Sequence, residues 1–295
     1  MHVPVLLQET ISVLEIKDGE VVVDATLGLG GHTKSIVETG KKIKIIAIDL
    51  DDEAIKIARE NLKDSSNIVF VEDNFRNLDK ILDDLDIKEV NKVLFDFGLS
   101  SFQIDHSGRG FSFQKDEPLK MTFGKSEVSA QWVVNKMNEN DLRQVLRNYG
   151  EERWTGRIAR AIVKEREKKK IETTRQLVEI IERVVPGKYR FGRIHPATKT
   201  FQALRIYVND ELASIEEGLS KAFLRLTPEG RIAAISFHSL EDRIVKHLFR
   251  AWETAGLAKV ISKKPITPTD EEISQNPRAR SAKLRVVKKL TTPVK

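Results

Sequence analysis

The sequence of 295 residues contains no cysteine. This absence excludes disulfide bonds, thiolate zinc sites and a cysteine nucleophile, and it favours a cytoplasmic protein. Long hydrophobic runs are also missing, since no apolar stretch approaches the roughly 20 residues that a membrane-spanning helix needs. The first ten residues, "MHVPVLLQET", show no basic segment before a long apolar stretch. We therefore expect no signal peptide and no membrane association.

Negative charge is scarce in the middle of the chain. Residues 143–205 contain 17 Lys and Arg against 7 Glu and no Asp, a net charge of +10 in a chain whose total is +6. Residues 273–295 add 7 basic residues and no acid. A single run such as "KEREKKK" is typical of a solvated helix face, but a whole basic segment favours a surface that binds nucleic acid.

The residues that are present predict a folded α/β protein. Hydrophobic residues make up 40% of the chain, enough for a sizeable core, and the length favours about two domains. Strand-like, β-branched runs are expected at residues 20–26, 42–50, 67–73 and 91–98. Helical patterns separate the first three of these runs, and this alternation predicts right-handed crossovers and a parallel sheet.

The pattern changes in the second third of the chain. Residues 126–186 show helical periodicity only, and a long helix is expected over 195–226 with Pro196 at its first position. A turn at "TPEG", residues 227–230, then leads into a fifth strand over 231–237. Ser239 is the expected N-cap of the next helix, because Asp242 follows it three residues later.

Two weaker strands, at residues 260–266 and 283–290, complete a mostly parallel, seven-stranded sheet. The α/β pattern is therefore interrupted by a helical segment and then resumed. We predict one domain from residues 1–106 and 206–295, and an inserted, all-helical, basic domain for RNA recognition from residues 107–205.

The stretch "VVVDATLGLGGHT", residues 21–33, joins a strand to a glycine-rich turn with Gly28, Gly30 and Gly31. The dinucleotide fingerprint G-x-G-x-x-G requires a third glycine where Thr33 stands, which disfavours a nicotinamide dehydrogenase. An acid ends the first strand at Asp24, and Asp49 ends the second. Acids beside such a turn favour a ligand with a cationic group over a pyrophosphate. S-adenosylmethionine fits, because its ribose diol can donate hydrogen bonds to Asp49.

Two more strand ends add candidates to the same edge of the sheet. Phe75, after the third strand, offers a flat apolar neighbour for an adenine, although ordinary core packing is the simpler explanation for this residue taken alone. Asp96 ends the fourth strand in "DFGLSS". Ligands of parallel sheets bind at this carboxyl edge.

Seven blocks stand in order along almost the whole chain: "HVPVLLQE", "DATLGLGGHT", "DFGLSSFQID", "RGFSF", "GEERW", "RIHPATKTFQALRIYVNDEL" and "SFHSLEDRIVK". Together they resemble the bacterial MraW/RsmH-type family of small-subunit rRNA methyltransferases. The resemblance implies a class I, Rossmann-like methyltransferase domain with an inserted helical domain. It implies S-adenosylmethionine-dependent N4-methylation of a cytosine in the decoding region of 16S rRNA, with 16S rRNA or the small ribosomal subunit as partner. It also implies a set of cofactor contacts: Gly30, Gly31, His32, Asp49, Phe75, Asp96 and Gln103.

One block departs from the family pattern. Residues 116–124 read "DEPLKMTFG", whereas family members tend to read "DGPLDMRMD". The arginine and two of the acids are missing, so no role of that block is transferred to this chain.

The chemistry of the proposed reaction points to Asp96. A cytosine N4 amine is a poor nucleophile, and an acceptor for its N–H together with a platform for the base would help it react. Asp96 is the candidate acceptor and Phe97 the candidate platform, but a role for Asp96 in cofactor binding alone is an equal alternative. Phe111 and Phe113 are candidates for base stacking, with core packing as the alternative. No metal is expected, because the leaving group is already positively charged and the six histidines show no ligand spacing.

Other functions remain open at this point. A methyltransferase of small molecules would not need the basic segment, and a non-catalytic RNA-binding protein would not need Asp24, Asp49 and the glycine turn together. A methyltransferase of another nucleic acid fits as well. The sequence shows neither the oligomeric state nor whether free rRNA or the assembled subunit is the substrate.

Overall fold

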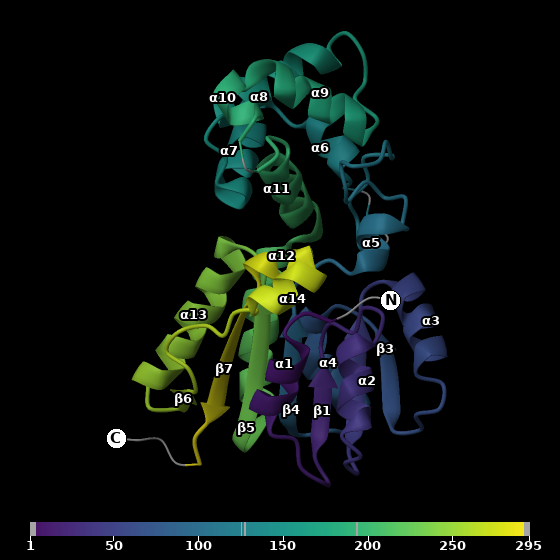
Figure 1. Ribbon diagram of the computed structural model, residues 1–295, viewed down its shortest axis with the longest axis vertical. Coiled ribbons are helices and arrows are strands. Elements are labelled where there is room, and N and C mark those ends of the chain that lie inside the picture. The colour runs from purple at the N-terminus through teal and green to yellow at the C-terminus, as the bar shows by residue number, and fades with distance from the viewer. Residues whose placement is uncertain (1–3, 125, 127, 193, 292–295) are drawn as a thin grey trace. The chain divides into compact units, whose positions relative to one another are not determined.

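The protein folds into two compact units in a computed structural model that describes residues 4–124, 126, 128–192 and 194–291 (Figure 1). One unit consists of residues 1–98 and 212–295, and the other of residues 99–211. The boundaries therefore lie at 98/99 and 211/212 rather than at the predicted 106/107 and 205/206. Within the described part of the chain, no helix combines the length and the apolar character that crossing a bilayer requires.

The first unit is built on a sheet that has seven strands in its described part, in the order β3-β2-β1-β4-β5-β7-β6. The strands are β1 (Val21–Asp24), β2 (Lys44–Asp49), β3 (Ile68–Glu72), β4 (Val90–Asp96), β5 (Leu226–Ser236), β6 (Ala258–Val260) and β7 (Lys283–Lys289). β1 to β5 pair in parallel, whereas β7 runs antiparallel to both of its neighbours, β5 and β6. This arrangement confirms the predicted mostly parallel α/β sheet.

Helices cover both faces of this sheet, which explains the continuous β-branched runs in its strands. Val22 and Leu94 face a core that α1 (Leu7–Leu14) and α2 (Gly31–Glu38) complete. Val23 and Phe95 face the opposite core, which is closed by α4 (Leu78–Asp84), α12 (Glu211–Arg225) and α13 (Ser239–Thr254). The remaining elements of the unit are α3 (Asp52–Asn61), η1 (Phe75–Asn77), α14 (Asp270–Gln275) and η2 (Pro277–Ser281).

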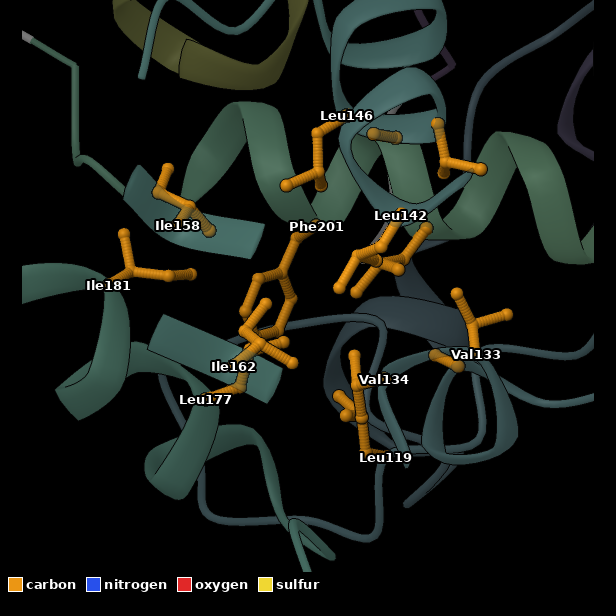
Figure 2. Packing of buried hydrophobic residues seen from close by; sticks show 14 of the residues in the cluster. Leu119, Val133, Val134, Leu142, Leu146, Ile158, Ile162, Leu177, Ile181 and Phe201 are labelled. Atoms are coloured by element: carbon orange, nitrogen blue, oxygen red, sulfur yellow. The ribbon is translucent and has the colours of Figure 1, made fainter. Parts of the chain in front are cut away.

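The second unit is helical and has a core of its own (Figure 2). Its helices are α5 (Ser101–Asp105), α6 (Ala130–Lys136), α7 (Glu139–Gly150), α8 (Thr155–Arg166), α9 (Thr174–Val184), α10 (Gly187–Arg190) and α11 (Thr198–Asn209). Phe201 of α11 lies among aliphatic side chains of the other helices, including Leu142, Ile162 and Leu177. The unit therefore holds together through its own buried apolar surface.

The structure corrects four local predictions. The weak strand expected at residues 260–266 is β6, which spans only Ala258–Val260. The expected long helix begins at Thr198 rather than at Pro196, and it is broken at Asp210, whose φ of 49° ends α11. The expected turn at residues 227–230 lies within β5, where the pairing with β4 shifts register. The N-cap of α13 is His238, which forms a capping box with Glu241, one residue earlier than predicted.

Candidate active site

The glycine-rich turn follows β1 and leads into α2. Gly28 and Gly30 both have left-handed backbone conformations, with φ of 52° and 82°. A Cβ atom on Gly30 would lie 2.8 Å from Cδ1 of Leu62, and one on Gly31 would lie 2.4 Å from Cγ of Pro4. The glycines are therefore required by both the backbone conformation and close packing around the turn.

Asp24 is buried beneath this turn and stabilises it through hydrogen bonds. Its side chain is only 1% exposed and accepts a hydrogen bond of 2.7 Å from the Thr33 hydroxyl. The Thr26 amide donates a second bond of 3.3 Å to it. Burial raises the pKa of Asp24, against the opposing effects of Thr33 and the nearby His32. Thr33, the residue that breaks the dinucleotide fingerprint, is thus the hydrogen-bond partner of the buried acid.

Asp49 joins the same turn to the end of β2. One carboxylate oxygen accepts a hydrogen bond of 2.7 Å from the Gly28 amide, and the other accepts one of 2.9 Å from the Asp51 amide. Burial raises the pKa of this carboxyl to about 6. A carboxylate has about four acceptor positions, so Asp49 keeps capacity for the two hydroxyls of a ribose diol. The side chain therefore fits the cofactor contact that the resemblance implies.

Asp96 ends β4, the strand next to β1, and lies beside the first turn of α2. Its amide donates a hydrogen bond of 2.6 Å to the Thr26 hydroxyl. One carboxylate oxygen lies 3.5 Å from Nε2 of His32, a side chain that is only 6% exposed. Among the described residues, both His32 nitrogens and Oδ1 of Asp96 are buried without a hydrogen-bond partner. Buried polar atoms normally have partners, so this pair indicates a place where a polar ligand binds.

Phe75 and Phe97 belong to an aromatic cluster at the ends of β3 and β4. The Phe75 ring centroid lies 5.6 Å from that of Phe95 and 6.0 Å from that of Phe97. Gly218 of α12 leaves space for the Phe75 ring, since a Cβ atom on this glycine would lie 2.6 Å from Cδ2 of Phe75. Phe75 is half-buried, so core packing and an adenine contact are compatible at this residue.

The helical unit contains the remaining predicted residues. Gln103 closes a capping box with Ser100 at the start of α5, and its contact with the cofactor stays a prediction. Phe111 is buried in the helical core and stacks on Phe123, with ring centroids 5.2 Å apart. Phe113 stacks on His195 at 4.6 Å. For Phe111 the structure favours core packing, the alternative to base stacking.

The block that departs from the family pattern has a structural role in this chain. The Leu119 amide donates to the Glu172 carbonyl, and the Thr174 amide donates to the Glu117 carbonyl, both at 2.9 Å. Leu119 is fully buried in the helical core. Residues 116–124 thus fix the start of α9.

Thr26 and Thr33 hold two of the strand-end acids in place, and the sequence alone does not predict this role. The Thr26 hydroxyl accepts a hydrogen bond from the Asp96 amide. The Thr33 hydroxyl donates one to the Asp24 carboxylate. Their position on either side of the glycines in "DATLGLGGHT" was the available signal. The contact between Thr26 and Asp96 arises because β1 pairs with β4, and this pairing is seen only in the structure.

Comparison with known proteins agrees with this geometry. The profile of the MraW methylase family matches residues 1–290. A Sulfurihydrogenibium protein named ribosomal RNA small subunit methyltransferase H is 49% identical over 291 residues, covering 98% of this chain and 99% of that protein. A Clostridium botulinum protein of the same name is 47% identical, again covering 98% and 99%. Among solved structures, an rRNA methylase from Streptococcus thermophilus has a TM-score of 0.45 at 12% identity, covering 96% of this chain and 93% of that one, a likeness too distant to bear on function.

The family match and the mostly parallel, seven-stranded sheet show that the chain is an S-adenosylmethionine-dependent methyltransferase with a class I fold. The chain belongs to the MraW methylase family, which confirms the resemblance seen in the sequence.

Proposed function

We propose that this chain methylates N4 of a cytosine in the decoding region of 16S rRNA, either free or within the small ribosomal subunit. The observation that supports this reaction best is the buried pair of His32 and Asp96, with unpartnered polar atoms at the end of β4. The names of the relatives support small-subunit rRNA as the substrate. That substrate in turn implies a cytoplasmic location.

The cofactor is held by the glycine turn and the neighbouring strand ends. Asp49 accepts hydrogen bonds from the ribose diol, and Phe75 lies beside the adenine. Gly30, Gly31 and His32 form the start of α2 next to this position. When bound, S-adenosylmethionine supplies a methyl group on a positively charged sulfur that leaves as a neutral thioether.

Asp96 acts on the cytosine amine. Its carboxylate accepts a hydrogen bond from the N4 amino group, holds the nitrogen toward the methyl donor and offsets the positive charge that develops on it. The Thr26 hydroxyl accepts a hydrogen bond of 2.6 Å from the Asp96 amide and so fixes the backbone of Asp96. The N4 amine becomes acidic only as the bond to the methyl group forms, so a strong base is not needed before that step, and the released proton then passes to the Asp96 carboxylate or to water.

The helical unit binds the RNA around the target base. Its basic segment, with a net charge of +10 over residues 143–205, suits phosphate groups, and a methylated base must be unpaired or pulled out of its stack. A methyltransferase of small molecules has no use for such a segment, which is why rRNA is the favoured substrate class.

The test is single-turnover methyl transfer to 16S rRNA and to small subunits from cells that lack this modification. We expect N4-methylcytidine, identified by mass spectrometry of the nucleosides. A methyl group on ring carbon 5 or on a ribose oxygen would show that the proposed chemistry is wrong. Transfer to the isolated nucleoside at the same rate would instead favour a small-molecule enzyme.

Cofactor binding should depend on pH through Asp49. The ionised carboxylate is the better acceptor for the ribose hydroxyls, so affinity should rise about tenfold between pH 5 and 7, around a pKa of about 6, and then level off. Calorimetric titration with S-adenosylmethionine across this range measures it. Asp49→Asn should show a flat profile, and an equal pH dependence in that variant would assign the effect to another group.

The same raised pKa affects folding in the opposite direction. The folded protein keeps the Asp49 proton until about pH 6, whereas the unfolded chain releases it near the ordinary pKa of an aspartate, 3.8. The stabilisation of the folded protein by the protonated Asp49 carboxyl is therefore fully present below pH 3.8 and is lost as the pH rises through about 6. Thermal unfolding at each pH without cofactor separates this effect from binding.

A further inference from the structure

We propose that one face of the helical unit, formed by Arg143, Arg153, Trp154 and Arg157, is a binding site for a single-stranded segment of the substrate RNA. This arginine–tryptophan face deepens the proposed function and rests on it. Its three arginines contact phosphate groups, a role that the charge count alone does not distinguish from that of the other basic residues of the unit.

Trp154 positions two of these arginines. The guanidinium carbon of Arg153 lies 5.4 Å from the indole ring centroid, and that of Arg157 lies 5.0 Å from it. Both distances are within the range of a cation–π interaction, which orders a guanidinium while leaving its N–H groups available. The two charges are therefore held in place at the start of α8 before any ligand arrives.

A third arginine reaches the same place from α7. The Nε atom of Arg143 lies 3.8 Å from the position that a Cβ atom on Gly156 would occupy. Gly156 lies between the two other arginines in the sequence, and the Arg143 guanidinium lies within van der Waals range of this position in the first turn of α8. Three guanidinium groups, from α7, from α8 and from the segment that joins them, thus lie around one short stretch of the chain.

These three arginines differ from other basic residues of the unit in their partners. Arg143, Arg153 and Arg157 are exposed, and none of them forms an ion pair with any described residue. By contrast, Arg160 pairs with Glu139 at 3.6 Å and Arg183 with Glu165 at 3.4 Å. The first turn of α8 contains no acid either. Converging, uncompensated and ordered guanidinium groups are suited to phosphate, which they can bind through two parallel hydrogen bonds.

Glu152, the acid that directly precedes Arg153 in the sequence, is directed inward. Glu152 is buried and accepts hydrogen bonds from the Trp154 amide at 2.8 Å and from the Tyr189 hydroxyl at 3.3 Å. Burial and this carboxylate raise the pKa of Tyr189 to about 12, so the phenol keeps its proton. The contact also places α10 against Trp154, since the Tyr189 ring centroid lies 6.3 Å from the indole.

The end of α10 supplies an aromatic ring for stacking. Phe191, two residues after Tyr189, is 85% exposed. Lys188 and Arg190 are exposed and form no ion pair with the described residues. An exposed aromatic ring among unpaired cations favours an unstacked base with flanking phosphates over an apolar protein surface. We therefore commit to single-stranded RNA as the occupant.

The test compares two double variants that each remove two positive charges from α8 or its end. Arg153→Ala with Arg157→Ala removes the ordered pair, whereas Lys164→Ala with Lys169→Ala removes two exposed lysines that have no aromatic partner. The probe is unmethylated 16S rRNA made by transcription, and its dissociation constant is measured from about 0.05 to 0.3 M KCl.

The arginine pair should weaken binding at least tenfold near 0.15 M salt. Each phosphate contact to a single strand contributes about 0.7 to the slope of log affinity against log salt, so the slope should fall by about 1.4 in magnitude. The lysine pair should change the slope by less than half of that. Phe191→Ala should weaken binding about tenfold without changing the slope, because stacking releases no counterions.

The outcomes separate the two levels of the proposal. If the unaltered protein neither binds nor methylates the rRNA, the proposed function fails. If it does both while the arginine pair behaves like the lysine pair, only the arginine–tryptophan face is overturned, and binding follows overall charge. If the arginine pair leaves rRNA binding intact but abolishes methylation of assembled subunits, the face binds a ribosomal protein and the inference is also overturned. An unchanged far-ultraviolet circular dichroism spectrum and an unchanged unfolding temperature confirm that each variant is folded.

Discussion

Asp96→Asn is expected to slow methyl transfer roughly 100-fold while leaving S-adenosylmethionine affinity within about threefold. The asparagine carbonyl can still accept a hydrogen bond from the cytosine amine. It cannot offset the positive charge that develops on the nitrogen as the methyl bond forms. The loss should therefore appear in the single-turnover rate at saturating cofactor and rRNA, not in the binding constants.

The position of Asp96 makes this substitution informative. Its main-chain amide is fixed by the Thr26 hydroxyl, and this bond does not depend on the side chain. Glu72→Gln is a suitable control, because it neutralises an exposed acid at the end of β3 without touching the pair of His32 and Asp96. Only a small effect on the rate of methyl transfer is expected for Glu72→Gln. A comparable loss in the control would show that the rate responds to the overall charge at this edge of the sheet.

Asp96→Asn also decides between the two roles that the sequence left open. Equal losses in turnover and in cofactor affinity would make Asp96 a cofactor ligand alone. A selective loss in turnover would make it a catalytic residue. Oδ1 of Asp96 is buried without a partner among the described residues, so the side chain has an acceptor to offer in either role.

The sequence correctly predicts which acids lie at the carboxyl edge of the sheet, for a physical reason. In a parallel sheet all strands end on the same side, so acids that follow β-branched runs must gather there. Asp24, Asp49 and Asp96 were predicted at this edge, and each ends its strand in the structure. What the sequence could not show is the direction in which each acid faces. Asp24 is directed into the turn toward Thr33, and only its burial reveals this.

The wrong local predictions depend on tertiary contacts. An apolar stripe continues through residues 201–219, which predicts one helix, but Asp210 adopts a left-handed conformation that acidic side chains tolerate better than most. The segment "TPEG" has turn-forming residues, yet it continues β5 because β4 pairs with the strand on both sides of the irregularity. Local propensity is overridden in both places by the environment of the segment.

Asp49→Ala is expected to weaken S-adenosylmethionine binding by about 2–3 kcal/mol, or roughly 30- to 150-fold. The substitution removes the charged acceptor of the ribose diol and leaves two hydroxyls without their partner. It also releases the Gly28 and Asp51 amides, which now donate to the carboxylate at 2.7 and 2.9 Å. Calorimetric titration with S-adenosylmethionine, and with NAD as a ligand that should not bind, gives the affinity directly.

Asp49→Asn separates the two parts of that loss. The amide keeps the size of the side chain and one acceptor oxygen, so it can preserve part of the hydrogen bonding to the turn, but it lacks the charge. We expect an intermediate affinity, about tenfold weaker than that of the unaltered protein, and a thermal stability closer to it than that of Asp49→Ala. If Asp49→Ala unfolds at the same temperature and binds the cofactor with full affinity, the carboxylate contacts neither the turn nor the ribose in solution. If its stability falls but its affinity does not, Asp49 is a structural residue, and the ribose is bound by another group at this edge of the sheet.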